Sequence, residues 1–242
     1  VSSVSVRPVN ESSKAAYTDT VAPVANIVYS PALTLKKNET LSIEANISEE
    51  TFEQPALRIS MSGANILTAA SMTKASTLKY TYTYQTQDGN GQVNLSLSGV
   101  TDKAGNPIVQ TPATGSSFTL DNSVPPLPGN IVISPVGGEI RVNTLNSTNT
   151  NLIITANIDS SKTAGGKAEL FIGSSSLPVA TDSTIINGDA TVNFDMGTTT
   201  NAALKALVPS GGEVKVRLYN GAGNYTDSVS NPTLTADYTA PA

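Results

Sequence analysis

A set of short segments that occurs twice in the same order constrains this 242-residue chain more than any other feature. NIVYSP is matched by NIVISP, LSIEANI by LIITANI, and the tripeptide Ala-Gly-Asn occurs at 104–106 and again at 222–224. Segments in which Asp is followed four residues later by Pro bracket both sets: DTVAP at 19–23, DNSVP at 121–125 and DYTAP at 237–241. Because the order is kept, the sequence predicts a duplicated domain.

Apolar and polar residues alternate with a period of two in both halves, which predicts β-strands. In the first half we expect strands at 25–29, 41–47, 56–60, 78–84, 92–98 and 117–120, with a weaker one at 65–68. In the second half we expect strands at 130–133, 152–158, 167–172, 190–194, 213–219 and 228–236, with weaker ones at 139–142 and 177–180. One short helix is expected at 201–207, ended by Pro209.

Each half is close to the ~100 residues of an immunoglobulin-like sandwich. We therefore predict an all-β protein with two tandem immunoglobulin-like β-sandwiches joined by a short linker. The first unit is expected at residues 19–121 and the second at 122–242. Residues 1–18 are expected to be an added N-terminal strand or the tail of a preceding domain.

Composition excludes several classes of function. The chain has no His and no Cys, which removes the usual Ser-His and Cys-His nucleophile systems and most zinc sites. A net charge of −5 argues against nucleic acid as a partner. No apolar run approaches the ~18 residues of a membrane-spanning helix. We therefore expect a protein that is not an enzyme, binds no nucleic acid and does not insert into membranes.

The repeated tripeptide is expected to form the turn after the sixth strand of each unit, with the residues Ala104, Gly105, Asn106, Ala222, Gly223 and Asn224. Glycine adopts positive φ at low cost, alanine is small enough to let the loop fold over the core, and asparagine can hydrogen-bond the turn backbone. A shared structural turn is the simpler interpretation. The alternative is that these loops line a domain junction and help to hold a cation.

In such a sandwich the start of the first strand and two of its loops share one pole, so polar residues there should converge. In the second unit this gathers Asp121, Asp159 and Asn220, with Asp88 approaching from the first unit; in the first unit it gathers Asp19, Glu49, Glu50 and Asp102. Oxygen ligands of this kind suit a structural Ca²⁺, the one cofactor that we consider. Asp and Asn are also common turn formers, so a purely structural role stays open.

The segment LKYTYTY places Tyr80, Tyr82 and Tyr84 on one face of a strand. A tyrosine row can serve as a sugar-binding platform. In a chain with 4 Phe and no Trp, it is more simply the face that packs into the core.

The junctions FTLDNSVPP and LTADYTAPA, with VTDKAGNP before the first, resemble the bacterial immunoglobulin-like repeats of surface-layer proteins, large adhesins and other cell-wall-attached proteins. The resemblance covers about residues 19–241. It implies a non-enzymatic, extracellular, modular protein, in some cases with Ca²⁺ at domain junctions. The second unit departs from the first by having Asn220 where the first has Asp102.

The expected function is that of a structural module of a bacterial cell-surface or cell-wall protein, acting as a semi-rigid spacer or lattice tile in a surface layer or similar array. An adhesin stalk or ligand-binding arm is the alternative, and a carbohydrate-binding or accessory module of a secreted polysaccharide-active enzyme is a second. Expected partners are neighbouring domains of the same longer chain, further copies of the chain, and a host or cell-wall glycan or protein.

Overall fold

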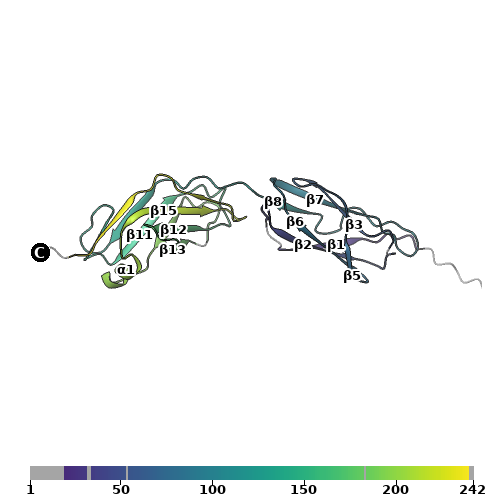
Figure 1. The fold of residues 1–242 in the computed structure, drawn as a ribbon, viewed down its shortest axis with the longest axis horizontal. Coiled ribbons are helices and arrows are strands. Elements are labelled where there is room, and N and C mark those ends of the chain that lie inside the picture. Colours follow the sequence, from purple (N-terminus) through teal and green to yellow (C-terminus); the bar gives the residue numbers. More distant parts are fainter. Residues whose placement is uncertain (1–18, 32–33, 53, 183, 240–242) are drawn as a thin grey trace, which may run out of the picture.

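The computed structural model describes residues 19–31, 34–52, 54–182 and 184–239. Strands dominate these residues, and α1 (Asn201–Leu207) is the one helix among them. Figure 1 shows two β-rich bodies placed end to end and joined by the chain that follows β8. The predicted strand or tail at residues 1–18 lies outside the described part.

The first body consists of two four-stranded sheets. One has the order β1 (Ala25–Ser30), β2 (Thr40–Ile47), β6 (Lys79–Gln85) and β5 (Thr73–Ser76). The other has the order β4 (Leu67–Ser71), β3 (Arg58–Gly63), β7 (Gly91–Ser98) and β8 (Ser117–Leu120). All of these neighbouring strands are antiparallel.

The second body repeats this plan with different sheet sizes. A three-stranded sheet has the order β14 (Thr191–Asp195), β11 (Asn151–Asn157) and β9 (Ile131–Val136). A six-stranded sheet has the order β10 (Thr144–Asn146), β17 (Thr233–Asp237), β15 (Gly212–Tyr219), β12 (Ala168–Ile172) and β13 (Ala180–Asp182), with β16 (Tyr225–Asp227) also paired to β15. The chain is therefore an all-β protein built as β-sandwiches.

The matching sequence segments occupy matching places in the two bodies. Ile27 of β1 lies opposite Ala45 of β2, and Ile131 of β9 lies opposite Ala156 of β11, so the registers coincide. Each body has its own core, and the two cores share no residue. Alternation explains the cores: on β2 the side chains of Leu41, Ile43, Ala45 and Ile47 are buried, and the residues between them are less so.

The tyrosine row faces the core, as the simpler interpretation has it. Tyr80 and Tyr84 are 3% and 7% exposed, and Tyr82 is partly buried. Their hydroxyl groups stay satisfied, because Tyr80 pairs with Thr51 at 2.9 Å and Tyr84 donates to Asn65 at 2.9 Å. The strand is therefore part of the sandwich interior and offers no exposed sugar platform.

The helix forms at its predicted position. Thr200 caps its first turn by accepting a hydrogen bond from the Ala203 amide at 3.2 Å, and Leu204 is its buried anchor. It lies between β14 and β15, where the chain crosses from one sheet to the other.

Several strand predictions are wrong in detail. The segment 139–142 is no strand, because Gly137 and Gly138 at positive φ turn the chain just before it; Ile140 and Val142 point to solvent. Of the predicted strand at 228–236, only the last part is a strand, β17 at 233–237, and β16 at 225–227 lies before the predicted segment. The weak strands predicted at 65–68 and 177–180 begin later, as β4 and β13. β5 is absent from the sequence prediction because all four of its residues are exposed, so it carries no alternating signal.

Candidate functional site

The first Ala-Gly-Asn loop is organised by Asp102, which is 1% exposed. Its Oδ1 accepts hydrogen bonds from the amides of Ala104 and Asn106, both at 2.8 Å. The Asn106 side chain then donates to the Asp102 Oδ2 at 2.8 Å and to the carbonyl oxygens of Asp19 and Val21. The loop thus holds the chain that enters the first unit as well as its own turn.

The second loop has the same geometry around Asn220, which is 5% exposed. Its Oδ1 accepts hydrogen bonds from the amides of Ala222 at 3.1 Å and Asn224 at 3.0 Å. The Asn224 side chain donates to the carbonyl oxygen of Asp121 at 2.7 Å. Gly105 and Gly223 both have positive φ, at 96° and 78°, as the turn requires. Ala222 is buried and Ala104 is exposed.

The two loops differ in what faces the junction aspartate. In the second unit the Asn220 side chain donates from Nδ2 to the Asp121 carboxylate at 3.0 Å and to the Ser123 carbonyl at 2.9 Å. In the first unit the equivalent atom is a carboxylate oxygen of Asp102, which cannot donate. The same place in the fold therefore holds a neutral amide in one unit and a second negative charge in the other.

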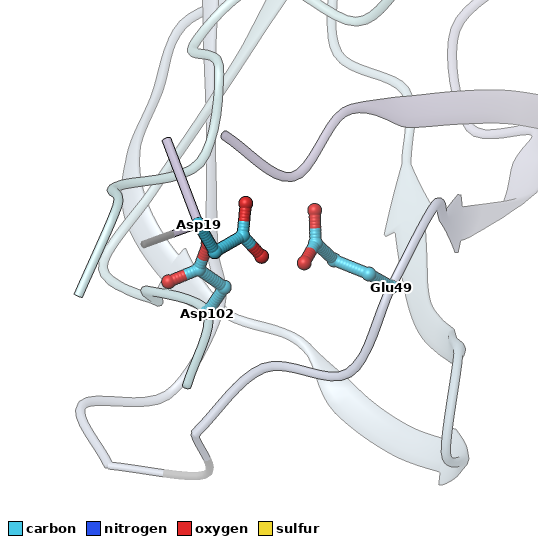
Figure 2. Close-up of side chains that lie close together, drawn as sticks. All are labelled: Asp19, Glu49 and Asp102. Atoms are coloured by element: carbon cyan, nitrogen blue, oxygen red, sulfur yellow. The ribbon is translucent and has the colours of Figure 1, made fainter. Parts of the chain in front are cut away.

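Glu49 adds a third carboxylate to this place in the first unit. Figure 2 shows the side chains of Asp19, Glu49 and Asp102 close together, on three separate segments, with the carboxyl groups of Asp19 and Glu49 facing each other. One oxygen from each lies within 4.8 Å of the others, and they are the one group of three or more acidic side chains with such spacing among the described residues. Three oxygen ligands at one point fit a hard cation such as Ca²⁺, which takes six to eight oxygens.

The charges of this group affect one another. Desolvation, followed by repulsion from Asp19 and Asp102, raises the pKa of Glu49 above its ordinary value. Burial alone would also raise the pKa of Asp102, but hydrogen bonds from the Asn106 side chain and from the loop amides outweigh it, so that pKa is lowered. Asp102 thus stays ionised, whereas the neighbouring negative charges help to raise the pKa of Glu49.

The other predicted ligands lie in different surroundings. Glu50 forms an ion pair with Lys103, and Asp88 forms one with Lys37 at 3.2 Å. Asp159 accepts hydrogen bonds from the amide and hydroxyl of Ser161. Asp121 belongs to no such group of three acidic side chains among the described residues.

The contact between the two units runs through Asp121. Its amide donates to the Leu35 carbonyl of the first unit at 2.8 Å, while its own oxygens accept the hydrogen bonds from Asn220 and Asn224 of the second. Lys36 adds a bond from its ammonium group to the Gly223 carbonyl at 2.9 Å. Sequence reasoning missed Lys36, because no motif marks a lysine that reaches a carbonyl so far along the chain.

Comparisons with known proteins give distant likenesses. The sequence matches no known protein family and no curated protein. The human OSCAR ligand-binding domain aligns with 88% of this chain and 98% of its own length, at 11% identity and a TM-score of 0.35. The adhesin InvE of Yersinia pseudotuberculosis aligns with 87% of this chain and 58% of its own length, at 13% identity and a TM-score of 0.31. Likenesses this distant assign no function to this chain.

The described residues contain no helix that is long and apolar enough to cross a membrane.

Proposed function

We propose that this chain is a non-enzymatic structural module of a bacterial cell-surface protein, in which two sandwiches held end to end act as a semi-rigid spacer or lattice tile. The junction is the single observation that carries this proposal. Asp121 is bonded to the first unit through its amide and to the second through its carbonyl and carboxylate oxygens. Pro125 and Pro126 follow within a few residues and restrict the linker backbone further.

Two features support a structural role over the alternatives. Tyr80 and Tyr84 are buried, so the strand that a carbohydrate-binding module would offer as a platform is part of the core. The side chains that gather at the pole of the first unit are carboxylates, whose chemistry suits a cation better than a covalent reaction. An adhesin stalk would use the same rod, with binding residues placed elsewhere on a longer chain.

Ca²⁺ bound by Asp19, Glu49 and Asp102 belongs to the same proposal. The cation would neutralise three carboxylates that otherwise repel one another, and it would fasten the chain entering the first unit to the loop after β7. In the second unit the amide of Asn220 fulfils the fastening role without a metal. The first unit would therefore fasten its entering chain with a cation, and the second unit with a side-chain amide.

The experiment that tests the spacer role measures the angle between the units in solution. Small-angle X-ray scattering of the wild-type chain should give an extended particle with a narrow spread of maximum dimensions. The double variant Asn220→Ala plus Asn224→Ala should bend more freely and give a broader spread. The matched control is Asn106→Ala, which removes the equivalent side chain at the pole that does not face the second unit. Equal scattering from the wild type and the double variant would contradict the proposal.

The location at the cell surface has its own test. Antibodies raised against this chain should label intact cells of the source organism, and external protease should remove the signal. Labelling that needs permeabilised cells would contradict an extracellular location while leaving the spacer geometry untouched.

A further inference from the structure

The two sandwiches differ in how they close the outer edge of their first strand. β1 and β9 are both edge strands, and both pair on their inner side with the following strand, in matching register. In the first unit the segment 113–115 lies against the outer edge of β1. The Ile27 amide donates to the Thr114 carbonyl at 3.0 Å, and the Ala113 amide donates to the Ala25 carbonyl at 2.8 Å.

This closure depends on a glycine. Gly115 has a φ of 66°, and a side chain there would come within 2.4 Å of the Ile27 carbonyl oxygen. The close approach lets the segment shield the β1 edge. The first unit therefore offers no free backbone at this position to another chain.

The second unit lacks the equivalent closure. The chain after Asn224 pairs with β15, as β16, and no strand among the described residues pairs with the outer side of β9. Ile131 occupies the position of Ile27, but no backbone bond of the Ile27 to Thr114 kind is present there in the described part of the chain. In an antiparallel ladder alternate residues point their backbone groups to opposite sides, so Ile131 and Ile133 direct theirs to the open edge.

An apolar groove accompanies the open edge. It is lined by β9 and by the segment 140–143, which is part of the longer connection that the second unit has between β9 and β10. Val132 is 44% exposed, Ile140 is 58% exposed and Val142 is 88% exposed. Exposed apolar side chains beside unpaired backbone groups are the usual features of a strand-pairing surface.

We propose that the β9 edge is a self-association surface, on which β9 of a second copy pairs antiparallel to extend the sheet across a two-fold axis. The edge is complementary to itself in a register that sets Ile131 opposite Ile133 of the other copy. That register uses the amide and carbonyl of both residues in each chain and does not need the amide that Pro135 lacks. It also sets Val132 opposite Val132 of the other copy, with Ile140 and Val142 of each chain beside the pair.

The spacer function requires no contact between chains, so this lateral contact can be absent while the end-to-end arrangement of the two units stands. Four backbone hydrogen bonds and a small apolar patch form a contact below the size of a stable dimer interface, so we expect a dissociation constant of roughly 0.1 mM.

The first test is sedimentation equilibrium across a concentration range that brackets that value. The wild-type chain should shift from monomer to dimer. Val132→Lys should weaken the dimer at least tenfold, because it places two like charges directly opposite each other at the two-fold axis. Val132 is exposed in the monomer, so the variant should keep the wild-type circular dichroism spectrum and melting curve. The matched control is Val28→Lys, at the equivalent, 54% exposed position of β1, which should dimerise like the wild type.

The second test uses the absence of cysteine from the chain. Val132→Cys should form an intermolecular disulfide under mild oxidation, since directly opposite residues in a non-hydrogen-bonded pair lie about 4.5 Å apart at Cα, within disulfide range. Val28→Cys should stay largely monomeric under the same conditions. A wild-type chain that is monomeric throughout, a dimer that survives Val132→Lys, or equal cross-linking at both positions would each overturn the proposal.

Discussion

The side-chain amide of Asn220 donates a hydrogen bond to the carboxylate of Asp121 at 3.0 Å, at the place where the first unit holds Asp102 beside Asp19. The surrounding loops are alike, since Asp102 and Asn220 each accept two backbone amides through Oδ1. The exchange of a carboxylate oxygen for an NH₂ group thus separates a hydrogen-bonded pair from a pair of carboxylates, to which Glu49 adds a third in the first unit. The chain contains both the amide and the carboxylate form of this contact, and the substitutions Asn220→Asp and Asp102→Asn convert each form into the other.

Exchanging the amide for a carboxylate in the second unit should weaken the junction. Asn220→Asp removes two donated hydrogen bonds and places a negative charge against Asp121. We expect a loss of about 1–3 kcal/mol in the free energy of unfolding of the second unit. Urea denaturation at neutral pH measures it, with Asn187→Asp, the same change at an exposed turn, as the control. Equal effects of the two substitutions would mean that only net charge matters.

Removing the cation should destabilise the first unit alone. At a free Ca²⁺ concentration of one hundred times the dissociation constant, binding contributes about 2.7 kcal/mol, which raises the melting midpoint of a domain this size by roughly 10–20 °C. Scanning calorimetry with added Ca²⁺ or with a chelator should show this shift. Asp102→Asn, which copies the second unit, should abolish the Ca²⁺ response while keeping the loop folded. A midpoint of the first unit that is the same in Ca²⁺ and chelator would reject the cation site.

The stability of the first unit should depend on pH through Glu49. The pKa of Glu49 is raised from its ordinary 4.5, so the folded chain holds this proton more tightly than the unfolded chain does. The resulting stability is present below that value and is lost as the pH rises through the raised pKa. In chelator, Glu49→Gln should remove this loss, so that the variant is more stable than the wild type near neutral pH. Denaturation curves from pH 4 to 7 test this, and Glu213→Gln in the second unit should leave the profile unchanged.

The two hydrophobic cores should unfold separately. Ile43 and Ile154 occupy matching positions on β2 and β11, and both are fully buried. Replacing either by Ala should cost about 2–5 kcal/mol, because it removes buried methyl groups and leaves a cavity. In calorimetry each substitution should lower one melting transition and leave the other within about 2 °C. One joint transition that moves equally in both variants would contradict independent cores.

Part of the candidate site could be predicted from sequence. The convergence of Asp19, Glu49 and Asp102 was expected from their places at strand ends. The separation of Glu50 from this group was not, because neighbouring residues at a strand end point in different directions and Lys103 is available to pair with Glu50. Nor could the sequence show that Asp121, Asp159 and Asp88 form no group of three carboxylates as closely spaced as that of the first unit. Those positions depend on loop paths, and local patterns do not determine loop paths.

The fold too could be predicted from the sequence only in part. Period-two alternation and the duplicated segments determined the strands of both cores, because burying one face of each strand leaves a strong pattern along the chain. The edges were decided by tertiary structure. β5 has no buried face, and the sequences of β1 and β9 are nearly alike although one edge is covered and the other open. The difference arises from chain outside these two strands: from the distant segment 113–115 in the first unit, and in the second unit from β16 at 225–227 and from the connection at 140–143 that follows β9. The alternation of apolar and polar residues along a strand shows which of its faces is buried. Whether the edge of a sheet is covered depends instead on the path of backbone outside that strand.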